Sequence, residues 1–242
     1  MRNALLVAGR ELGAYLRSPL GYVVAAASLL IDGILYYAFV LGAGQQRLSA
    51  EVLMNFFYYA SGTTMIAAVA LSIRLLAGER ENGTLVLLNT APIRDSEIVA
   101  GKFLSAFAFL AAMTLATIYM PALIFVNGKV SLGHIAVGYL GLLLIASAAL
   151  SIGLFASALA RTQVIAAILG AALLGTMVLL WAAAKVTDPP LAGFVSGLAI
   201  HHEHFKPFMT GVLKLENVAY YLGVSYFFLL CATKTLEARR WR

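Results

Sequence analysis

The chain contains few charged residues and a single cysteine. Charged residues make up 12% of its 242 residues, hydrophobic residues make up 62%, and the mean hydropathy is +0.89. A soluble globular domain carries about 25% charged residues, so the composition excludes that class and predicts a protein of the lipid bilayer. Cys231 has no second thiol with which to form an intramolecular disulfide or to bind a metal ion.

The sequence also lacks the motifs of two kinds of enzyme. The phosphate-binding pattern G-x-x-x-x-G-K-[ST], in which backbone N–H groups and a lysine hold a nucleotide, is absent. The zinc-protease pattern H-E-x-x-H is not met, because Lys206 stands where the second histidine should follow His202 and Glu203. We therefore expect no catalytic residue, no metal and no cofactor in this chain.

What the sequence has in abundance is long apolar runs. A membrane-spanning helix needs about 20 mostly apolar residues, whereas the strands of a membrane β-barrel would appear as alternating segments of about ten residues. The runs therefore predict an all-α integral membrane protein, with residues 1–242 forming a single domain. The six predicted spans are residues 20–41, 56–73, 103–126, 135–159, 164–184 and 215–233.

Lys and Arg residues are distributed unevenly between the segments that connect these spans. Twelve of the seventeen lie before the first span, between spans two and three, between spans four and five, and after the last span. The positive-inside rule places these segments, residues 74–102 and both termini among them, in the cytoplasm, and residues 185–214 outside. Anionic lipid headgroups account for most of the net charge of +6, so no nucleic-acid partner is expected.

Two short segments outside the spans are predicted to lie at the membrane surface. Residues 1–19 mix leucines with arginines, which is typical of an interfacial helix, and Pro19 disfavours helical geometry at Ser18. This helix anchors the chain, and a contact with a cytoplasmic partner is compatible with the same position. Residues 191–200 are apolar but too short to span, which predicts a re-entrant or interfacial helix.

The segment between spans two and three has a more detailed pattern. Gly83 interrupts the helix that leaves span two, and Leu85 and Leu88, three residues apart, share one face of a short helix. Pro92 ends this short helix, and Asp95 is the expected N-cap of the next one. The spacing alone fits a coupling helix and an ordinary solvated loop equally well.

At this point the sequence resembles type 2 ABC exporter permeases, in particular the gliding-motility type and the similar permeases of nitrous-oxide reductase maturation. The resemblance spans nearly the whole chain, although Gly78 and Val86 stand where the family often has acidic residues. The elements that carry it are Arg10-Glu11-Leu12, Ser18-Pro19, Arg74-Leu75, residues 79–85, Leu88, Pro92, Gly101-Lys102, His204-Phe205, Gly211-Val212 and Tyr220-Tyr221-Leu222.

The resemblance implies a subunit of an exporter in the cytoplasmic membrane. It would pair with a second permease copy or a paralogue and with an ABC ATPase dimer, which would hold ATP and Mg and supply the hydrolysis that drives export. The short helix after span two would dock on the ATPase, with apolar contacts from its leucines, polar contacts from its charged residues and a turn at its glycine. The residues that this role implies are Glu79, Arg80, Glu81, Gly83, Thr84, Leu85, Leu88 and Pro92.

Asp32 is the acidic residue well inside a predicted span. A charged side chain at the bilayer centre costs about 2.5–3.5 kcal/mol on insertion scales, so Asp32 should face protein or water. It is either a polar group on a translocation path or dimer interface, or a neutral carboxyl packed between helices. The alternative function, an ion-coupled secondary transporter, would use Asp32 as its ion site, but the matching broken helices typical of inverted repeats are not evident.

His201, His202 and His204 form a cluster that raises a metal site as an alternative. We favour a simpler interpretation, in which the cluster ends the interfacial helix at the level of the lipid headgroups. An intramembrane enzyme, the third function class, would rest on this cluster alone and lacks a pair of catalytic groups within the spans.

Overall fold

The computed structural model describes residues 2–41, 49–84, 93–124 and 130–240. These residues form helices and turns and contain no strand, and six of their helices are long and apolar enough to cross a membrane. The predicted all-α fold with six spans is therefore confirmed. The spanning helices are α2 (Pro19–Leu35), α3 (Ser49–Ser72), α6 (Asp95–Ala116), α8 (Leu132–Leu159), α9 (Gln163–Ala184) and α12 (Leu215–Arg240).

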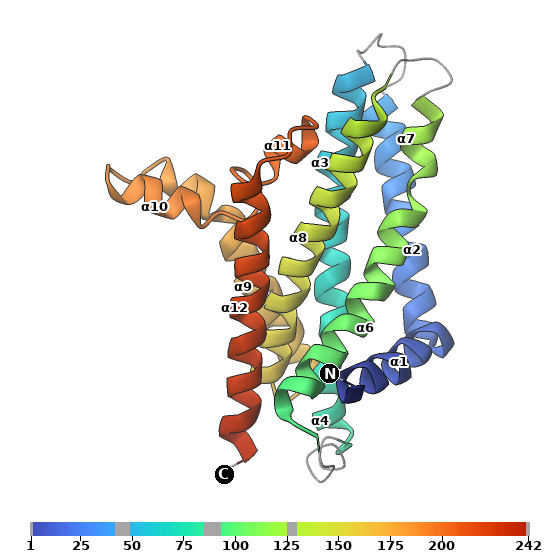
Figure 1. Ribbon diagram of the computed structural model, residues 1–242, viewed down its shortest axis with the longest axis vertical. Helices are drawn as coiled ribbons and strands as arrows, with labels where there is room; N and C mark the ends of the chain where they lie inside the picture. Colours follow the sequence, from blue (N-terminus) through green and yellow to red (C-terminus); the bar gives the residue numbers. More distant parts are fainter. Residues whose placement is uncertain (1, 42–48, 85–92, 125–129, 241–242) are drawn as a thin grey trace.

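Shorter elements extend or connect these helices. Helix α2 continues as η1 (Tyr36–Leu41), and α3 continues through η2 (Arg74–Gly78) into α4 (Glu79–Glu81). Outside the spans lie α1 (Arg2–Arg17), α7 (Tyr119–Ile124), α10 (Leu191–Gly197) and α11 (Lys206–Met209). Figure 1 shows α1 lying across one end of the bundle, which we call the basal end and where α4 and the last turns of α12 also lie. Helix α10 projects sideways nearer the opposite end.

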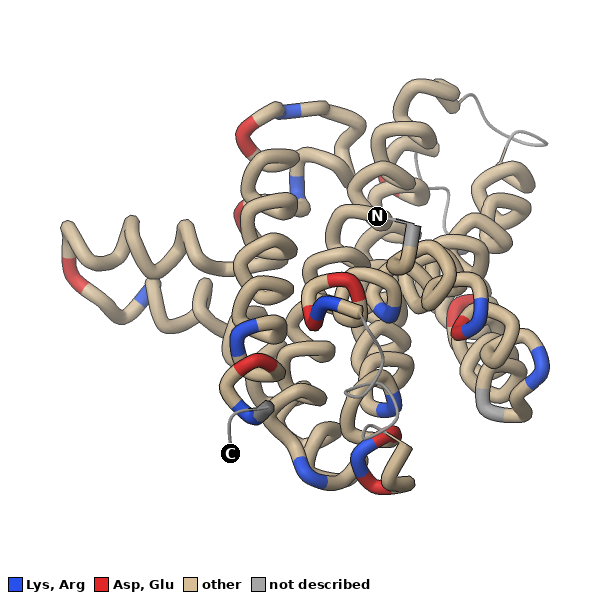
Figure 2. The backbone as a smooth tube through the Cα atoms, turned by 60° about the horizontal axis from the view of Figure 1, so that its bottom comes forward, with Lys and Arg blue, Asp and Glu red and all other residues tan. Residues whose placement is uncertain are grey.

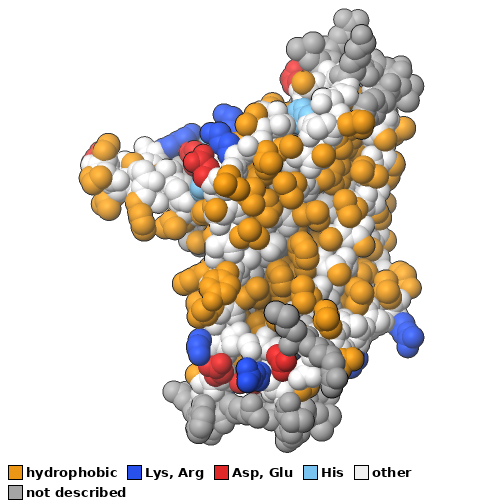
Figure 3. Space-filling model, viewed as in Figure 1, with side chains coloured by type: hydrophobic (Ala, Val, Ile, Leu, Met, Phe, Trp, Pro, Cys, Tyr) orange, Lys and Arg blue, Asp and Glu red, His pale blue; other side chains and the backbone are white. Residues whose placement is uncertain are grey.

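Helix α8 is the centre of the bundle. Of the residues in an apolar 18-residue stretch of α8, 78% are buried, whereas the shares in the corresponding stretches of α2 and α9 are 11% and 17%. Figure 3 shows hydrophobic side chains over the middle of one face, with charged side chains towards the two ends. This distribution suits a bilayer, because its hydrocarbon core contains no water that could solvate charged side chains.

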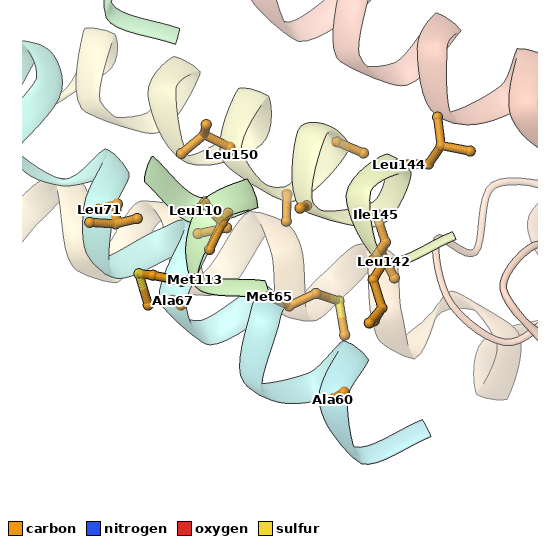
Figure 4. Packing of buried hydrophobic residues seen from close by; sticks show 14 of the residues in the cluster. Ala60, Met65, Ala67, Leu71, Leu110, Met113, Leu142, Leu144, Ile145 and Leu150 are labelled. Atoms are coloured by element: carbon orange, nitrogen blue, oxygen red, sulfur yellow. The ribbon is translucent and has the colours of Figure 1, made fainter. Parts of the chain in front are cut away.

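Small residues allow the helices around α8 to approach closely. A Cβ atom on Gly153 would lie 2.7 Å from the Cβ of Ser72 on α3, and Ala156, one turn further, is fully buried. In lipid, such close packing stabilises helix pairs through van der Waals contacts. Figure 4 shows the neighbouring part of the core, where Leu71 of α3, Leu110 of α6 and Leu150 of α8 lie in the same packed interior.

Several predicted boundaries differ from the structure. The span predicted over residues 56–73 belongs to a continuous helical stretch from Ser49 to Glu81, and the span predicted from residue 103 begins at Asp95. Apolar runs underestimate these helices because their ends carry charged residues that are still helical. The prediction that Asp95 is an N-cap is wrong by one residue, since Arg94 occupies that position and Glu97 Oε2 accepts its backbone N–H at 3.3 Å.

We predict that Gly153→Ala destabilises the protein. The added methyl group would meet the Ser72 side chain, and overpacking of this kind costs about 1–3 kcal/mol. The matched control is Gly62→Ala on α3, where nothing lies within 4 Å of the added Cβ. Thermal unfolding of the purified variants should show a lower midpoint for Gly153→Ala alone, and equal midpoints would contradict the packing described here.

Candidate functional site

A cluster of four charged side chains joins three helices at the basal end. Lys102 of α6 is 1% exposed, and its Nζ lies 2.7 Å from Glu79 Oε1 of α4 and 3.4 Å from Glu11 Oε1 of α1. Arg10 Nη2 lies 2.7 Å from Glu11 Oε1 and 3.6 Å from Glu79 Oε1. Two cations thus face two carboxylates, as burial of a charge requires. Figure 2 brings this end forward and shows acidic and basic positions side by side.

The position of this basal cluster depends on the residue before Lys102. A Cβ on Gly101 would lie 2.7 Å from the backbone oxygen of Ala4 and 2.8 Å from Cβ of Val7, so glycine lets α1 approach α6 closely. Ala4 and Val7 are buried against α6, while Leu5 and Leu6 on the other side of α1 are about two-thirds exposed. The short Gly101-Lys102 sequence therefore provides both the close contact and the buried charge.

The electrostatics of the cluster favour the ionised forms of Glu11 and Arg10. Burial raises the pKa of the Glu11 carboxyl, but Lys102 and Arg10 together outweigh burial and hold this pKa below its ordinary value. The hydrogen bond to Glu11 raises the pKa of Arg10. The pair formed by Arg10 and Glu11 is therefore charged at neutral pH.

The two residues after Glu79 bond to two further helices. Arg80 donates to the backbone oxygens of Ala158, at 3.3 Å, and Ala160, where the last carbonyls of α8 lack intrahelical partners. Glu81 Oε2 accepts the backbone N–H of Gln163 at 3.1 Å, at the first turn of α9. A cation at a helix C-terminus and an anion at an N-terminus are both favourable. The triplet Glu79-Arg80-Glu81 thus contacts α1, α6, α8 and α9.

The helix that carries this triplet ends immediately after it. Gly83 has a φ of 73°, a left-handed conformation that favours glycine, and the backbone N–H of Thr84 donates to the Glu79 oxygen at 2.9 Å. The side chains of Asn82 and Thr84 are exposed at the basal end. Leu85, Leu88 and Pro92, which complete the predicted docking segment, lie outside the described residues.

Asp32 lies apart from this site, in the last turn of α2 before the helix continues as η1. It is 9% exposed and accepts a hydrogen bond from Thr63 Oγ1 of α3 at 2.5 Å. Its side chain therefore faces the neighbouring helices and not the surrounding lipid. The structure does not bring Asp32 and the triplet together.

The three clustered histidines have three separate sets of contacts. His201 Nε2 lies 2.8 Å from Ser61 Oγ, and the ring of His202 stacks on Trp181 with centroids 4.5 Å apart. His204 stacks on Tyr220 at 3.6 Å and bonds to neighbouring polar groups. Among the residues that the structure describes, no three His, Cys, Asp or Glu side chains are grouped as metal ligands would be.

Sequence reasoning missed the role of two residues in the site. Glu11 and Lys102 entered only as part of a family resemblance and of the charge count, whereas in the structure Lys102 pairs with both Glu79 and Glu11, and Glu11 also pairs with Arg10. A signal was present, because a lysine at the start of an apolar helix needs a carboxylate partner if it is buried. The identity of that partner depends on tertiary packing.

Comparison with known proteins adds one finding. The family model described as ABC-2 family transporter protein matches residues 8–231, a range that begins in α1 and ends in α12. A search of curated proteins finds no match.

We predict that Lys102→Met destabilises the protein by on the order of 3 kcal/mol, because it leaves Glu11 and Glu79 without their buried cation. Lys234→Met is the matched control, since Lys234 pairs with Glu237 at the same 2.7 Å but is 67% exposed. An exposed pair contributes at most about 1 kcal/mol. Thermal unfolding measures both variants, and a similar loss in both would show that burial of Lys102 is not decisive.

We also predict that acidification destabilises the protein through His201. Burial, and secondarily the neighbouring His202, lowers the pKa of His201 from 6.5 to about 4. The unfolded chain therefore binds the proton first, and stability falls as the pH drops from about 6.5 to 4, by on the order of 2 kcal/mol at pH 5. Unfolding midpoints at pH 7.5 and 5 should differ much less in His201→Gln, whereas His202→Gln, at an exposed position, keeps most of the wild-type difference because burial is the larger cause. An undiminished difference in His201→Gln would refute this assignment.

Proposed function

The chain belongs to the ABC-2 transporter family and is thus a permease subunit of an ABC transporter, and we propose that it couples ATP hydrolysis in a separate ATPase subunit to export across the cytoplasmic membrane. The family supplies the membrane component and not the ATPase, which agrees with the missing phosphate-binding motif. ATP and Mg belong to the partner in this proposal. The partner is an ABC ATPase dimer, and the substrate crosses through the membrane subunit.

The observation that carries this proposal is the set of contacts made by Glu79-Arg80-Glu81. The triplet directly precedes the exposed residues 82–84, and its three side chains bond to groups of α1, α6, α8 and α9. A partner that displaces the segment after Glu81 would move those four helices with it. In the proposed mechanism the ATPase docks on residues 82–92, with Leu85, Leu88 and Pro92 in the contact, and the triplet passes the displacement to the bundle.

The basal end also supports a proposal for the orientation of the protein in the membrane. We propose that the basal end faces the cytoplasm, because it gathers α1, the triplet and the basic end of α12. Exposed Leu5 and Leu6 on α1, next to arginines, fit a helix that lies at the inner lipid interface. Both termini are then cytoplasmic, and α10 and α11 belong to the outer side.

We further propose that the functional unit contains a second permease copy or a paralogue. Helices α2 and α9 bury little of their length within this chain, so their faces are available to lipid or to a second subunit. The gliding-motility subtype rests on the sequence resemblance in the docking and outer segments. Family membership disfavours the alternative of an ion-coupled secondary transporter.

The docking role predicts that Gly83→Val reduces ATPase activity in the complete complex. A β-branched residue is strained at a φ of 73°, by about 1–2 kcal/mol, which disfavours the turn described here by about 5- to 30-fold. Gly193→Val on α10 is the control, because Gly193 has open space around it and lies far from the triplet.

The measurement is permease-dependent ATPase activity of reconstituted complexes, together with the thermal unfolding midpoint of each variant. We expect Gly83→Val to lose activity while its midpoint falls by only a few degrees, because the exposed turn can rearrange without disturbing the bundle. Full activity in Gly83→Val would count against docking at this segment.

A further inference from the structure

Asp32 occupies a position where an uncompensated charge is unfavourable. It lies 13 residues after the start of α2, about 20 Å along the helix axis, which is well inside a hydrocarbon core of about 30 Å. Its side chain is 9% exposed, and no Lys or Arg is among the described residues that line the cavity beside it. An isolated carboxylate at this depth would retain a penalty of several kcal/mol.

The cavity beside Asp32 is small and rich in hydroxyl groups. Its volume is about 10 Å³, which is close to the space needed for one water molecule. It lies between α2, α3, α6 and α8, with apolar side chains forming the rest of its wall. The polar residues that line it are Ser28, Asp32, Thr63, Thr64, Thr114 and Thr117.

The hydrogen bonds around Asp32 leave its charge unmatched. Thr63 Oγ1 lies 2.5 Å from Asp32 Oδ1 and 3.0 Å from the backbone oxygen of Ala60, but the threonine hydroxyl has only one hydrogen to donate. If Asp32 is protonated, its carboxyl O–H can donate to Thr63 Oγ1 while the Thr63 hydroxyl donates to the Ala60 oxygen, so that both contacts are hydrogen bonds. The hydroxyl of Thr117 donates to the Thr114 oxygen at 2.7 Å, so its hydrogen is already in use.

From this geometry we propose that Asp32, Thr63 and the hydroxyl-lined cavity form a binding site for one monovalent cation, either a proton or Na⁺. A proton would complete the hydrogen bonds of Thr63, and Na⁺ would take the carboxylate and hydroxyl oxygens that hard cations prefer as ligands. The bound cation neutralises Asp32 and joins α2 to α3. The titratable side chain nearby is Tyr139 of α8, whose hydroxyl lies 3.0 Å from Thr117 Oγ1.

This cation site goes beyond the proposed export function and is testable without the ATPase. Thermal unfolding of the full chain in lipid nanodiscs is measured in NaCl and in choline chloride at constant ionic strength, and from pH 5 to 9, with His201→Gln as the background so that His201 does not contribute to the pH dependence. If Na⁺ is the ligand, the midpoint rises by about 5 °C or more at a concentration of about 100 times its Kd. If a proton is the ligand, the midpoint falls as the pH rises and Na⁺ has no effect.

Two variants decide whether the response belongs to this site. Asp32→Asn keeps the shape of the side chain without its charge, and it should abolish whichever response is measured while Asp32 is intact. Thr63→Val keeps Asp32 but removes its hydroxyl partner, and it should weaken the same response even if Asp32→Asn fails to fold. The control is Thr176→Val, which removes an exposed hydroxyl that bonds only within its own helix, to Ala172.

Three results would overturn the proposal. One is a midpoint that depends neither on Na⁺ nor on pH in this range while Asp32 is intact. Another is a dependence that persists in Asp32→Asn. The third is an equal response in Thr63→Val and Thr176→Val.

Discussion

The basal end of the molecule depends on the burial of one ammonium group. Lys102 is 1% exposed, so its charge is tolerated only while Glu79 and Glu11 remain within reach. Those two carboxylates belong to α4 and α1, and Gly101 sets how closely α1 approaches. The requirement to keep one buried charge compensated therefore fixes the relative positions of three helices. The same end presents residues 82–84 to solvent.

The spans were predictable because their length is set by the bilayer and not by tertiary contacts. Their ends were not, since the helix through Glu79 and the start of α6 carry charges that interrupt an apolar run but not a helix. The partners of the triplet were also beyond sequence reasoning. Arg80 bonds to carbonyls 78 and 80 residues away, and no local pattern indicates that distance. The predicted docking leucines lie outside the described residues, so their role stays a proposal.

Polar residues that look alike in the sequence have different environments in the fold. His201, His202 and His204 are nearly consecutive, yet the turn that carries them directs each ring to a different set of contacts. Their residue type and their proximity along the chain suggested one cluster, but the backbone geometry points the three rings in different directions. Asp32, which has no acidic or basic neighbour in its run, instead bonds to Thr63 of α3 beside a cavity whose hydroxyl groups come mostly from other helices.

The helical stretch from Ser49 to Glu81 is longer than the hydrocarbon core of a membrane is thick. Its 33 residues correspond to about 50 Å of helix, and the π-helical segment η2 (Arg74–Gly78), a common place for a helix to bend, lies between the span and Glu81. The tight contact of Ser72 with Gly153 holds α3 in place just before η2, so that η2 is where α4 can change its angle relative to α3. A displacement of Glu81 would then bend the stretch at η2 and reach α8, because the Ser157 hydroxyl accepts the backbone N–H groups of Leu76 and Ala77.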